Sequence, residues 1–230
     1  MSGNTNPNVV TDGLVLCLDA GNSQSYPGSG TTWTDLAGSY NTTLINGPTF
    51  SSANGGSIDF DASNDYTDTG WGSGLNPTTA SYSFEAWVKA DNTTTFQMFL
   101  APSDHGSNQR AYFSKHNTGK WLMGIGGANG DESVWSNQDV TTNWTHMAII
   151  LNSTDNKGRL YINGVLEDTG DAYTSYTFNQ NFNIGRGGSG SSPGFYWGGL
   201  ISNVKIYASK ALTATEILQN YNAHKARYGL

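Results

Sequence analysis

Side chains that could carry out catalysis are few in this chain and lie far apart along it. Retaining hydrolysis of a glycosidic bond needs two carboxylates about 5 Å apart, which on one strand means acidic residues at positions i and i+2 or i+4. The four glutamates, at positions 85, 132, 167 and 216, are isolated from one another. The four histidines show no metal-ligand spacing, and Cys17 has no adjacent base. We therefore expect no catalytic residues and no enzymatic activity.

Aromatic side chains near predicted loops are better candidates, in this case for recognition of a sugar. An aromatic ring stacks on the apolar face of a pyranose, while neighbouring Asn, Asp and Gly residues supply hydrogen-bond donors and acceptors. Four such rings are Trp71, Trp135, Tyr196 and Trp197. Because loops carry most binding in sandwich proteins, these four are the candidate carbohydrate-binding residues. The alternative is that each ring covers one end of a sandwich.

The elements that must position these residues are short strands separated by turn residues. Apolar and alternating runs bounded by Gly, Asn, Asp, Ser and Thr predict them. The predicted strands are 14–19, 57–60, 82–89, 96–101, 110–114, 121–125, 144–152, 158–162, 182–185 and 199–207. Many strands with almost no helix predict an all-β protein of two packed antiparallel sheets.

We expect one domain with a short N-terminal arm. A chain of 230 residues can bury an ample core as one all-β unit, and no linker-like boundary divides it. The flexible arm is predicted over residues 1–12 and the domain over 13–230. Asn163-Gly164 predicts a two-residue hairpin turn, because both residues tolerate positive φ. A capping box at Thr213-Ala-Thr-Glu216 predicts a helix over 214–227 that covers an edge or closes an end of the sandwich.

Composition excludes several classes of partner. The net charge of −7 argues against nucleic acid, whose phosphates are bound by clustered Lys and Arg. No basic segment followed by an apolar core marks a secretory signal at the N-terminus, and no run of about eighteen apolar residues could cross a membrane. Cys17 is expected to be a small buried hydrophobic residue. The chain is thus predicted to bind neither nucleic acid nor a membrane.

Trp144 and His146 lie on the same face of a predicted strand whose other members are apolar. A packing role is expected for both, because alternation places them together on one side of the sheet. We expect His146 to be a hydrogen-bonded structural histidine and not a participant in chemistry.

Several segments together resemble a known family. They are Asn143–Ile150, Gly158–Gly164, Asn183–Arg186, Gly199–Tyr207 and Ala211–Glu216. These segments look like those of laminin-G-like, concanavalin A-like jelly-roll domains, so the resemblance implies a two-sheet antiparallel jelly-roll sandwich with one short C-terminal helix. The N-terminal part, including Gly13–Ala20 and Trp33–Leu36, resembles the version found in phage and marine-virus virion proteins.

The resemblance implies a non-enzymatic virion surface protein, of the capsid-decoration or tail-fibre type, with a lectin-like domain that binds host-surface carbohydrate. Its partners would be other virion proteins and host glycans, and we expect a homo-oligomer. The arm would anchor on a neighbouring subunit through Asn8, Val9 and Val10. The alternatives are a free, extracellular lectin and a polysaccharide hydrolase. The Glu-x-Asp-x-Glu signature of hydrolases in this family is absent here.

Calcium is the cofactor that such domains imply, held by loop oxygens of Asp, Asn and backbone carbonyls. Asp61, Asn64 and Asp65, directly after a predicted strand, are the candidate ligands, and Asp19 is a further one. Many relatives carry an acidic pair where this chain has serine and asparagine at 202 and 203, which weakens a site for a hard cation. The alternative is a turn rich in Asp and Asn without a metal.

Overall fold

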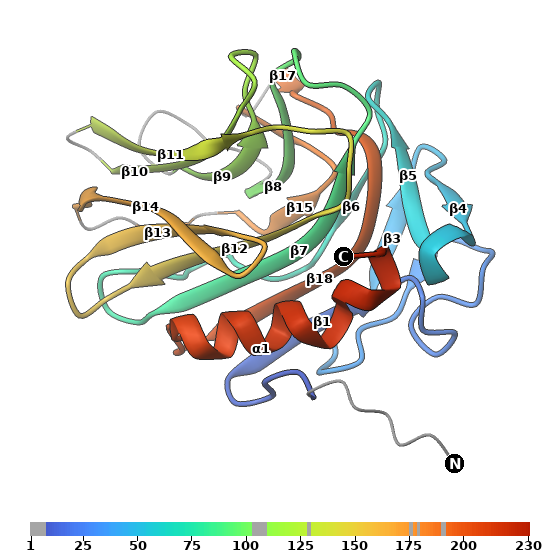
Figure 1. Cartoon of the computed structure of the whole chain (residues 1–230), viewed down its shortest axis with the longest axis horizontal. Coiled ribbons are helices and arrows are strands. Elements are labelled where there is room, and N and C mark those ends of the chain that lie inside the picture. Colours follow the sequence, from blue (N-terminus) through green and yellow to red (C-terminus); the bar gives the residue numbers. More distant parts are fainter. Residues whose placement is uncertain (1–7, 103–109, 128–129, 175–176, 179, 190–191) are drawn as a thin grey trace.

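The computed structural model describes residues 8–102, 110–127, 130–174, 177–178, 180–189 and 192–230. In this part of the chain two antiparallel sheets of eight strands each pack face to face, and one short helix lies against the first sheet (Figure 1). The predicted fold class, a two-sheet antiparallel jelly-roll sandwich with a C-terminal helix, is confirmed. No helix within these ranges is long and apolar enough to cross a membrane.

The first sheet, sheet A, carries the helix on its outer face. Its strands in spatial order are β14 (Val165–Ala172), β13 (Lys157–Ile162), β12 (Thr145–Asn152), β7 (Tyr82–Ala90), β18 (Gly198–Ala208), β5 (Ser57–Asp61) and β4 (Thr49–Ser51), with β1 (Leu14–Asp19) paired to β18. Strand β18 changes partner along its length, because residues 198–201 pair with β5 and residues 203–207 with β1. A bulge between Ile201 and Asn203 marks the change.

The outer face of the second sheet, sheet B, lies on the side of the molecule away from the helix. Its strands in spatial order are β11 (Gly130–Asp139), β10 (Lys120–Gly127), β9 (Arg110–Lys115), β8 (Gln97–Pro102), β15 (Phe182–Ile184), β6 (Tyr66–Asp68), β3 (Thr42–Ile45) and β2 (Thr32–Trp33). A small hairpin of β16 (Gly187–Ser189) and β17 (Ser192–Gly194) packs over β8, and a 3-10 turn, η1, spans Ala53–Gly55.

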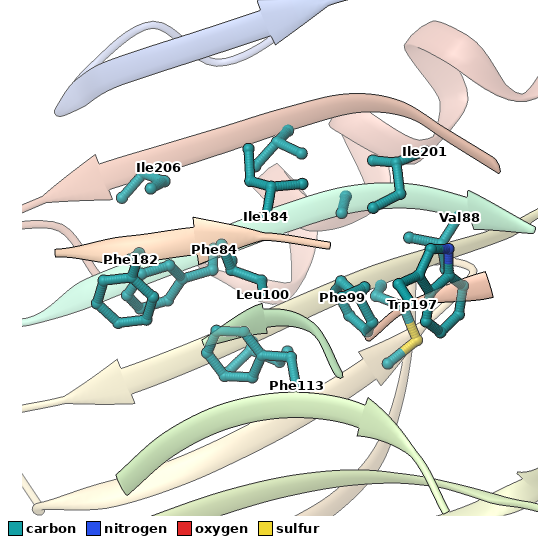
Figure 2. Packing of buried hydrophobic residues seen from close by; sticks show 14 of the residues in the cluster. Phe84, Val88, Phe99, Leu100, Phe113, Phe182, Ile184, Trp197, Ile201 and Ile206 are labelled. Atoms are coloured by element: carbon teal, nitrogen blue, oxygen red, sulfur yellow. The ribbon is translucent and has the colours of Figure 1, made fainter. Parts of the chain in front are cut away.

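The core lies between the two sheets and is built by strand alternation. On β7 the side chains of residues 84, 86 and 88 join the core, whereas Trp87 belongs to a separate cluster under the helix. Figure 2 shows Phe84 of sheet A beside Phe113 and Phe182 of sheet B, and the ring centroids of Phe84 and Phe182 are 5.0 Å apart. Each buried ring of this kind stabilises the fold by roughly 2 to 3 kcal/mol through removal of apolar surface from water.

Helix α1 (Ala214–His224) covers the outer face of sheet A and continues into a 3-10 turn, η2 (Lys225–Tyr228). It begins at the predicted capping box: Thr213 accepts the Glu216 N–H, and Glu216 accepts the Thr213 N–H at 2.8 Å. Ile217 packs with apolar side chains of β12, β13 and β18. The expectation that the helix covers an edge or an end is therefore wrong, since a sheet face with apolar side chains needs a cover of its own.

Polar side chains are also buried between sheet A and α1. Asn220 of the helix donates through Nδ2 to Glu85 Oε2 at 2.8 Å and to the Tyr207 hydroxyl at 2.9 Å. His146 is buried, as expected, but neither of its ring nitrogens has a hydrogen-bond partner among the described residues. Its Nε2 lies 3.6 Å from Glu85 Oε1, so the predicted hydrogen bond is replaced by a looser contact. Cys17 is only partly buried.

The chain is held against α1 from Asn8 onward, while residues 1–7 of the predicted arm lie outside the described residues. The Val10 N–H donates to Asn220 Oδ1 at 2.8 Å, and the Tyr207 hydroxyl donates to the Val10 carbonyl at 3.2 Å. Gln219 donates to the Asn8 carbonyl at 2.6 Å. The structure thus places two of the three candidate anchoring residues in contact with their own domain.

Candidate functional site

Five ring side chains gather on the outer face of sheet B, at its β11 end. They are Phe96, Tyr112, His116, Trp135 and Phe195, and we call them the aromatic surface. Trp135 is 37% exposed and Phe195 is 43% exposed, while the other three rings are partly buried. Exposed rings that contact one another form an apolar patch, and such patches on soluble proteins mark interaction sites.

The alternation of side chains along β9 and β11 places three of these rings on the outer face of sheet B. On β9, Phe113 belongs to the core, so Tyr112 points to the outer face, and His116 just beyond the strand has the same parity. On β11, Val134 belongs to the core and Trp135 points outward. Rings that lie far apart in the sequence therefore meet on one face of the sheet.

Each of the five rings contacts at least one of the others. The Trp135 and His116 rings are 4.9 Å apart between centroids and nearly perpendicular, at 86°. Phe96 contacts His116 at 5.3 Å, Tyr112 at 6.1 Å and Phe195 at 4.8 Å. Tilted and edge-to-face arrangements of this kind are the favourable geometries for aromatic pairs. The mutual packing holds the rings in place and leaves the outer ones available to a ligand.

A glycine makes room for one of these rings. Gly124 of β10 lies directly opposite Tyr112 of β9, and a Cβ added to Gly124 would overlap the Tyr112 ring. The tyrosine ring thus occupies the space beside Gly124 that the side chain of any other residue would fill. Leu122, which lies opposite Trp135, is only 3% exposed although its parity directs it outward.

The backbone of Phe195 is in the left-handed region, with φ of 59°. Bulky residues seldom adopt this conformation, and its cost is on the order of 1 to 3 kcal/mol. The Phe195 carbonyl accepts the Met98 N–H at 2.8 Å, which fixes the segment to the edge of β8. This turn brings the ring against Phe96, so local strain is retained where the aromatic surface ends.

A buried lysine fixes the loop that precedes Phe96. Lys115 Nζ donates to the Asn92 carbonyl at 2.6 Å and pairs with Asp91 Oδ1 at 3.1 Å, with no exposure of the Lys115 side chain. Burial lowers the pKa of Lys115, and the Asp91 carboxylate opposes that shift. The Lys115 ammonium group is paired inside the protein. This lysine therefore stabilises the loop before Phe96 and does not bind a ligand.

Of the four predicted carbohydrate-binding residues, Trp135 lies on the aromatic surface. Trp71 is only 6% exposed and packs against Tyr82 and Phe182 in the core. Trp197 has no exposed surface and lies in the core beside Phe99 (Figure 2). For these two, the expectation of a loop ring open to a ligand is corrected, because both side chains fill the space between the sheets. Tyr196 is partly buried.

Sequence reasoning missed four members of the aromatic surface. The sequence predicts Phe96 as the first residue of a strand, and it gives His116 no role because the four histidines show no metal-ligand spacing. The signal that could have found them is the parity of Tyr112, which sets it and His116 on the face opposite Phe113. No such signal predicts Phe195, whose position depends on a left-handed turn.

The predicted calcium ligands form a tight turn after β5. The backbone N–H groups of Ser63 and Asn64 donate to Asp61 Oδ1, at 2.9 and 3.2 Å, and Asp65 Oδ2 accepts the Asp61 N–H at 3.1 Å. These bonds lower the pKa of Asp61, whereas burial raises the pKa of Asp65. Because the carboxylates already accept backbone donors, the turn does not present a convergent set of oxygens.

The described residues contain no group of three or more His, Cys, Asp or Glu side chains that could hold a metal ion. Asp19, the further calcium candidate, accepts Arg227 Nη1 at 2.7 Å, and Ser202 accepts Arg227 Nη2 at the same distance. The positive charge of the Arg227 guanidinium thus compensates the charge of Asp19 without a metal ion. Calcium binding stays a prediction, and we derive no step through it.

A shallow depression of about 310 Å³ lies on the outer face of sheet A, beyond the end of α1. It is lined by Ser51, Asp59, Lys89, Ala90, Asp91, Gly199 and Leu200. Burial and the nearby carboxylates of Asp91 and Asp61 raise the pKa of Asp59. No aromatic ring lines this depression, so it lacks the feature that makes the outer face of sheet B a candidate for sugar recognition.

Comparison with protein families finds a match over residues 60–218 to the model of the concanavalin A-like lectin/glucanases superfamily. Comparison with curated proteins finds no match.

Solved structures share the fold at low sequence identity. Domain 4 of AbnA, a GH43 extracellular arabinanase from Geobacillus stearothermophilus in complex with arabinotriose, matches with a TM-score of 0.64 and 19% identity over 90% of this chain and 98% of that one. The binding domain of Paraclostridial Mosquitocidal Protein 1 matches with a TM-score of 0.69 and 15% identity over 93% and 52%. Trypanosoma rangeli sialidase in complex with sialic acid gives 0.67 and 16% over 94% and 33%. The chain thus spans about half of the toxin domain and a third of the sialidase.

Proposed function

The chain belongs to the concanavalin A-like lectin/glucanase superfamily, and we propose that it is a non-enzymatic carbohydrate-binding domain. The observation that carries this proposal is the aromatic surface, with Trp135 and Phe195 exposed on the outer face of sheet B. A pyranose ring has an apolar C–H face, which an exposed aromatic side chain can cover while the sugar hydroxyls remain hydrogen-bonded. The surface has the residue types that such recognition requires.

Two kinds of structural relative support the proposal. The arabinanase domain was solved with a neutral oligosaccharide, arabinotriose, and it is matched over nearly its whole length. The sialidase was solved with sialic acid, and the toxin relative is itself a binding domain. The identities are below 20%, so these relatives supply the fold and the idea of a glycan ligand but no binding residue.

The burial and the hydrogen bonds of the glutamate side chains support a non-enzymatic role. Glu85 has no exposed side chain and lies under α1, on the other side of the molecule from the aromatic surface. Glu167 accepts three donors from Asn137 and Gln138, and Glu216 belongs to the helix cap. Three of the four glutamates therefore have structural contacts, whereas glycoside hydrolysis would need two carboxylates free to face one sugar.

Display on the surface of a virus particle, as a capsid decoration or tail-fibre domain, is the setting that we propose for this activity. The chain enters the domain beside α1, on the outer side of sheet A (Figure 1). The aromatic surface lies on the outer side of sheet B. An attachment through the N-terminal side would leave the aromatic surface pointing outward. Mass spectrometry of purified particles separates this setting from a free extracellular lectin, since a free lectin would be absent from them.

A glycan array tests the proposed binding with Trp135→Ala and a matched control. The control is Tyr40→Ala, because Tyr40 is 38% exposed and precedes β3, while Trp135 lies on β11 at the other end of sheet B. Wild type and Tyr40→Ala are expected to bind the same glycans. Trp135→Ala should lose roughly tenfold in affinity, since an aromatic contact contributes about 0.5 to 1.5 kcal/mol beyond the apolar surface that it buries.

The array includes neutral, sialylated and sulfated glycans, each with and without calcium. Absence of binding by the wild-type protein on the whole array would contradict the proposed function. Equal binding by wild type and Trp135→Ala would show that the ligand lies elsewhere on the molecule. Release of reducing sugar from laminarin, agar or alginate would contradict the non-enzymatic part.

A further inference from the structure

The imidazole of His116 has one nitrogen that is fully engaged by the protein. The backbone N–H of Thr118 donates to His116 Nδ1 at 3.2 Å, and the Thr118 hydroxyl lies 2.9 Å from the same nitrogen. A ring nitrogen that accepts an N–H carries no proton, so in the neutral imidazole the proton is on Nε2. The turn after β9 thus fixes the tautomer and makes Nε2–H a donor.

This donor is open to a ligand. Within the part of the chain that the structure describes, Nε2 of His116 has no hydrogen-bond partner and is not one of the buried polar atoms. The two ring nitrogens of His146 are also without partners, but they are buried under α1. His116 is therefore a histidine with a surface donor of known position, and His146 is not.

The donor lies beside the exposed tryptophan. The centroid of the His116 ring lies 4.9 Å from that of Trp135, at an interplanar angle of 86°, and 5.3 Å from that of Phe96. The neighbouring Ser114 hydroxyl donates to the Leu122 carbonyl, so it is already used inside the sheet. A ligand that covers the Trp135 ring would have its edge next to the imidazole.

We infer that His116 is the residue that selects the ligand of the aromatic surface, by donating from Nε2 to a sugar oxygen while the sugar stacks on Trp135. The inference rests on the proposed function and names its ligand more closely. The ligand is a pyranoside with an apolar face for the tryptophan and, at its rim, an oxygen that accepts one hydrogen bond. Sugars that share the stacking face but lack that oxygen are rejected, because His116 would lose its water without gaining a partner.

His116→Phe and His116→Gln test this role on the glycan array described above. Phenylalanine keeps a flat ring between Trp135 and Phe96 but has no donor, whereas the amide of glutamine can donate. His116→Phe is expected to lose about tenfold in affinity for the best glycan, the effect of one hydrogen bond in a partly dry site. His116→Gln should retain more affinity than His116→Phe, and both should melt within a few degrees of the wild type.

The outcomes separate the inference from the proposed function. Wild-type binding that Trp135→Ala weakens and His116→Phe leaves unchanged would overturn the inference while the proposed function stands. No wild-type binding to any glycan would overturn both. If His116→Phe does not fold, His116→Ala replaces it: weaker binding by His116→Ala than by His116→Gln supports the inference, and equal binding by His116→Ala and Tyr40→Ala overturns it.

Modified sugars identify the hydrogen bond itself. On the glycan that the array selects, each ring hydroxyl is replaced in turn by hydrogen or by a methoxy group. An N–H donor needs an acceptor oxygen, so one deoxy sugar should bind about tenfold more weakly, while its methoxy counterpart, where it fits, retains the acceptor. The same deoxy change should have no effect on His116→Phe. An equal effect on both proteins would assign the contact to another residue and overturn the inference.

Discussion

The protonation state of the Glu85 carboxyl group depends on its burial in the folded protein. It lies between sheet A and α1 without exposure, and burial raises its pKa to about 7, against the opposing effects of Lys205, Asn220 and Tyr207. His146 Nε2 lies 3.6 Å from Oε1. Burial lowers the pKa of His146 well below its ordinary value, so the imidazole is neutral and does not stabilise a carboxylate charge.

Glu85→Gln is therefore expected to stabilise the protein at high pH. The ordinary pKa of the carboxyl group is 4.5, and in the folded protein it is about 7. A raised folded-state pKa stabilises the protonated form, so this contribution is present below pH 4.5 and is lost as the pH rises through 7. The variant should match the wild type near pH 4.5 and exceed it by about 3 kcal/mol at pH 8, as measured by urea unfolding.

The titration of His146 and His224 does not affect the difference in stability between Glu85→Gln and the wild type. Burial lowers the pKa of His146 and lowers that of His224 to about 3, so their contribution is lost as the pH falls below 6.5. That loss occurs in the wild type and in Glu85→Gln alike, and it cancels in the difference between them. A difference that does not change between pH 4.5 and pH 8 would show that Glu85 is ionised in the folded protein.

At the scale of elements, alternation predicted the long strands well and the short or polar ones poorly. The predicted runs 82–89 and 144–152 correspond closely to β7 and β12. Strands of two to four residues, such as β2 and β6, are too short to show a period. Strand β11 was missed because the apolar side chains in Gly130–Asp139 are Val134 and Trp135, which are adjacent, so the segment shows no alternation of apolar and polar residues.

Of the five rings of the aromatic surface, the sequence predicted one. Trp135 was identified as an exposed ring, but near a loop, whereas it lies on the outer face of β11. Trp197 was expected beside a flexible loop, yet the chain returns into the core after Phe195. The exposure of a ring depends on the side of the sheet that it occupies, and a short sequence motif does not contain that information.

The turn and cap predictions succeeded because their chemistry is local. Asn163 and Gly164 both have positive φ, of 51° and 82°, as a type I′ hairpin turn requires. The capping box at Thr213 is formed by residues three positions apart. Such signals need no knowledge of distant segments, in contrast to the contacts of the aromatic surface.

Strand β10 offers a test of how the sheet supports the aromatic surface. Gly124→Ala would place a methyl group in the ring of Tyr112, so the tyrosine must move. We expect a loss of about 1 to 3 kcal/mol in unfolding free energy, the cost of overpacking, and weaker glycan binding because Phe96 packs on Tyr112. Urea unfolding and the glycan array provide the two measurements.

The double variant Tyr112→Ala, Gly124→Ala is the control for this prediction. Removal of the tyrosine ring relieves the overlap, so Gly124→Ala should cost much less stability in the Tyr112→Ala background than in the wild type. The same cost in both backgrounds would mean that the glycine is needed for its backbone and not for the ring.

At the scale of the whole molecule, the two outer faces of the sandwich differ in what covers them. Much of the outer face of sheet A is covered by α1, the turn η2 and the segment from Asn8 (Figure 1). The outer face of sheet B is open and carries the aromatic surface. This division supports a protein that is attached on one side and binds on the other.

Tryptophan indole N–H resonances can show whether the aromatic surface binds carbohydrate. The chain has seven tryptophans, and in the described residues Trp135 is exposed while Trp33, Trp71, Trp87, Trp121, Trp144 and Trp197 are buried. A nuclear magnetic resonance titration of indole-labelled protein with the glycan selected by the array should shift the Trp135 signal first and most. A saturable shift of a different indole signal, with Trp135 unchanged, would contradict the account.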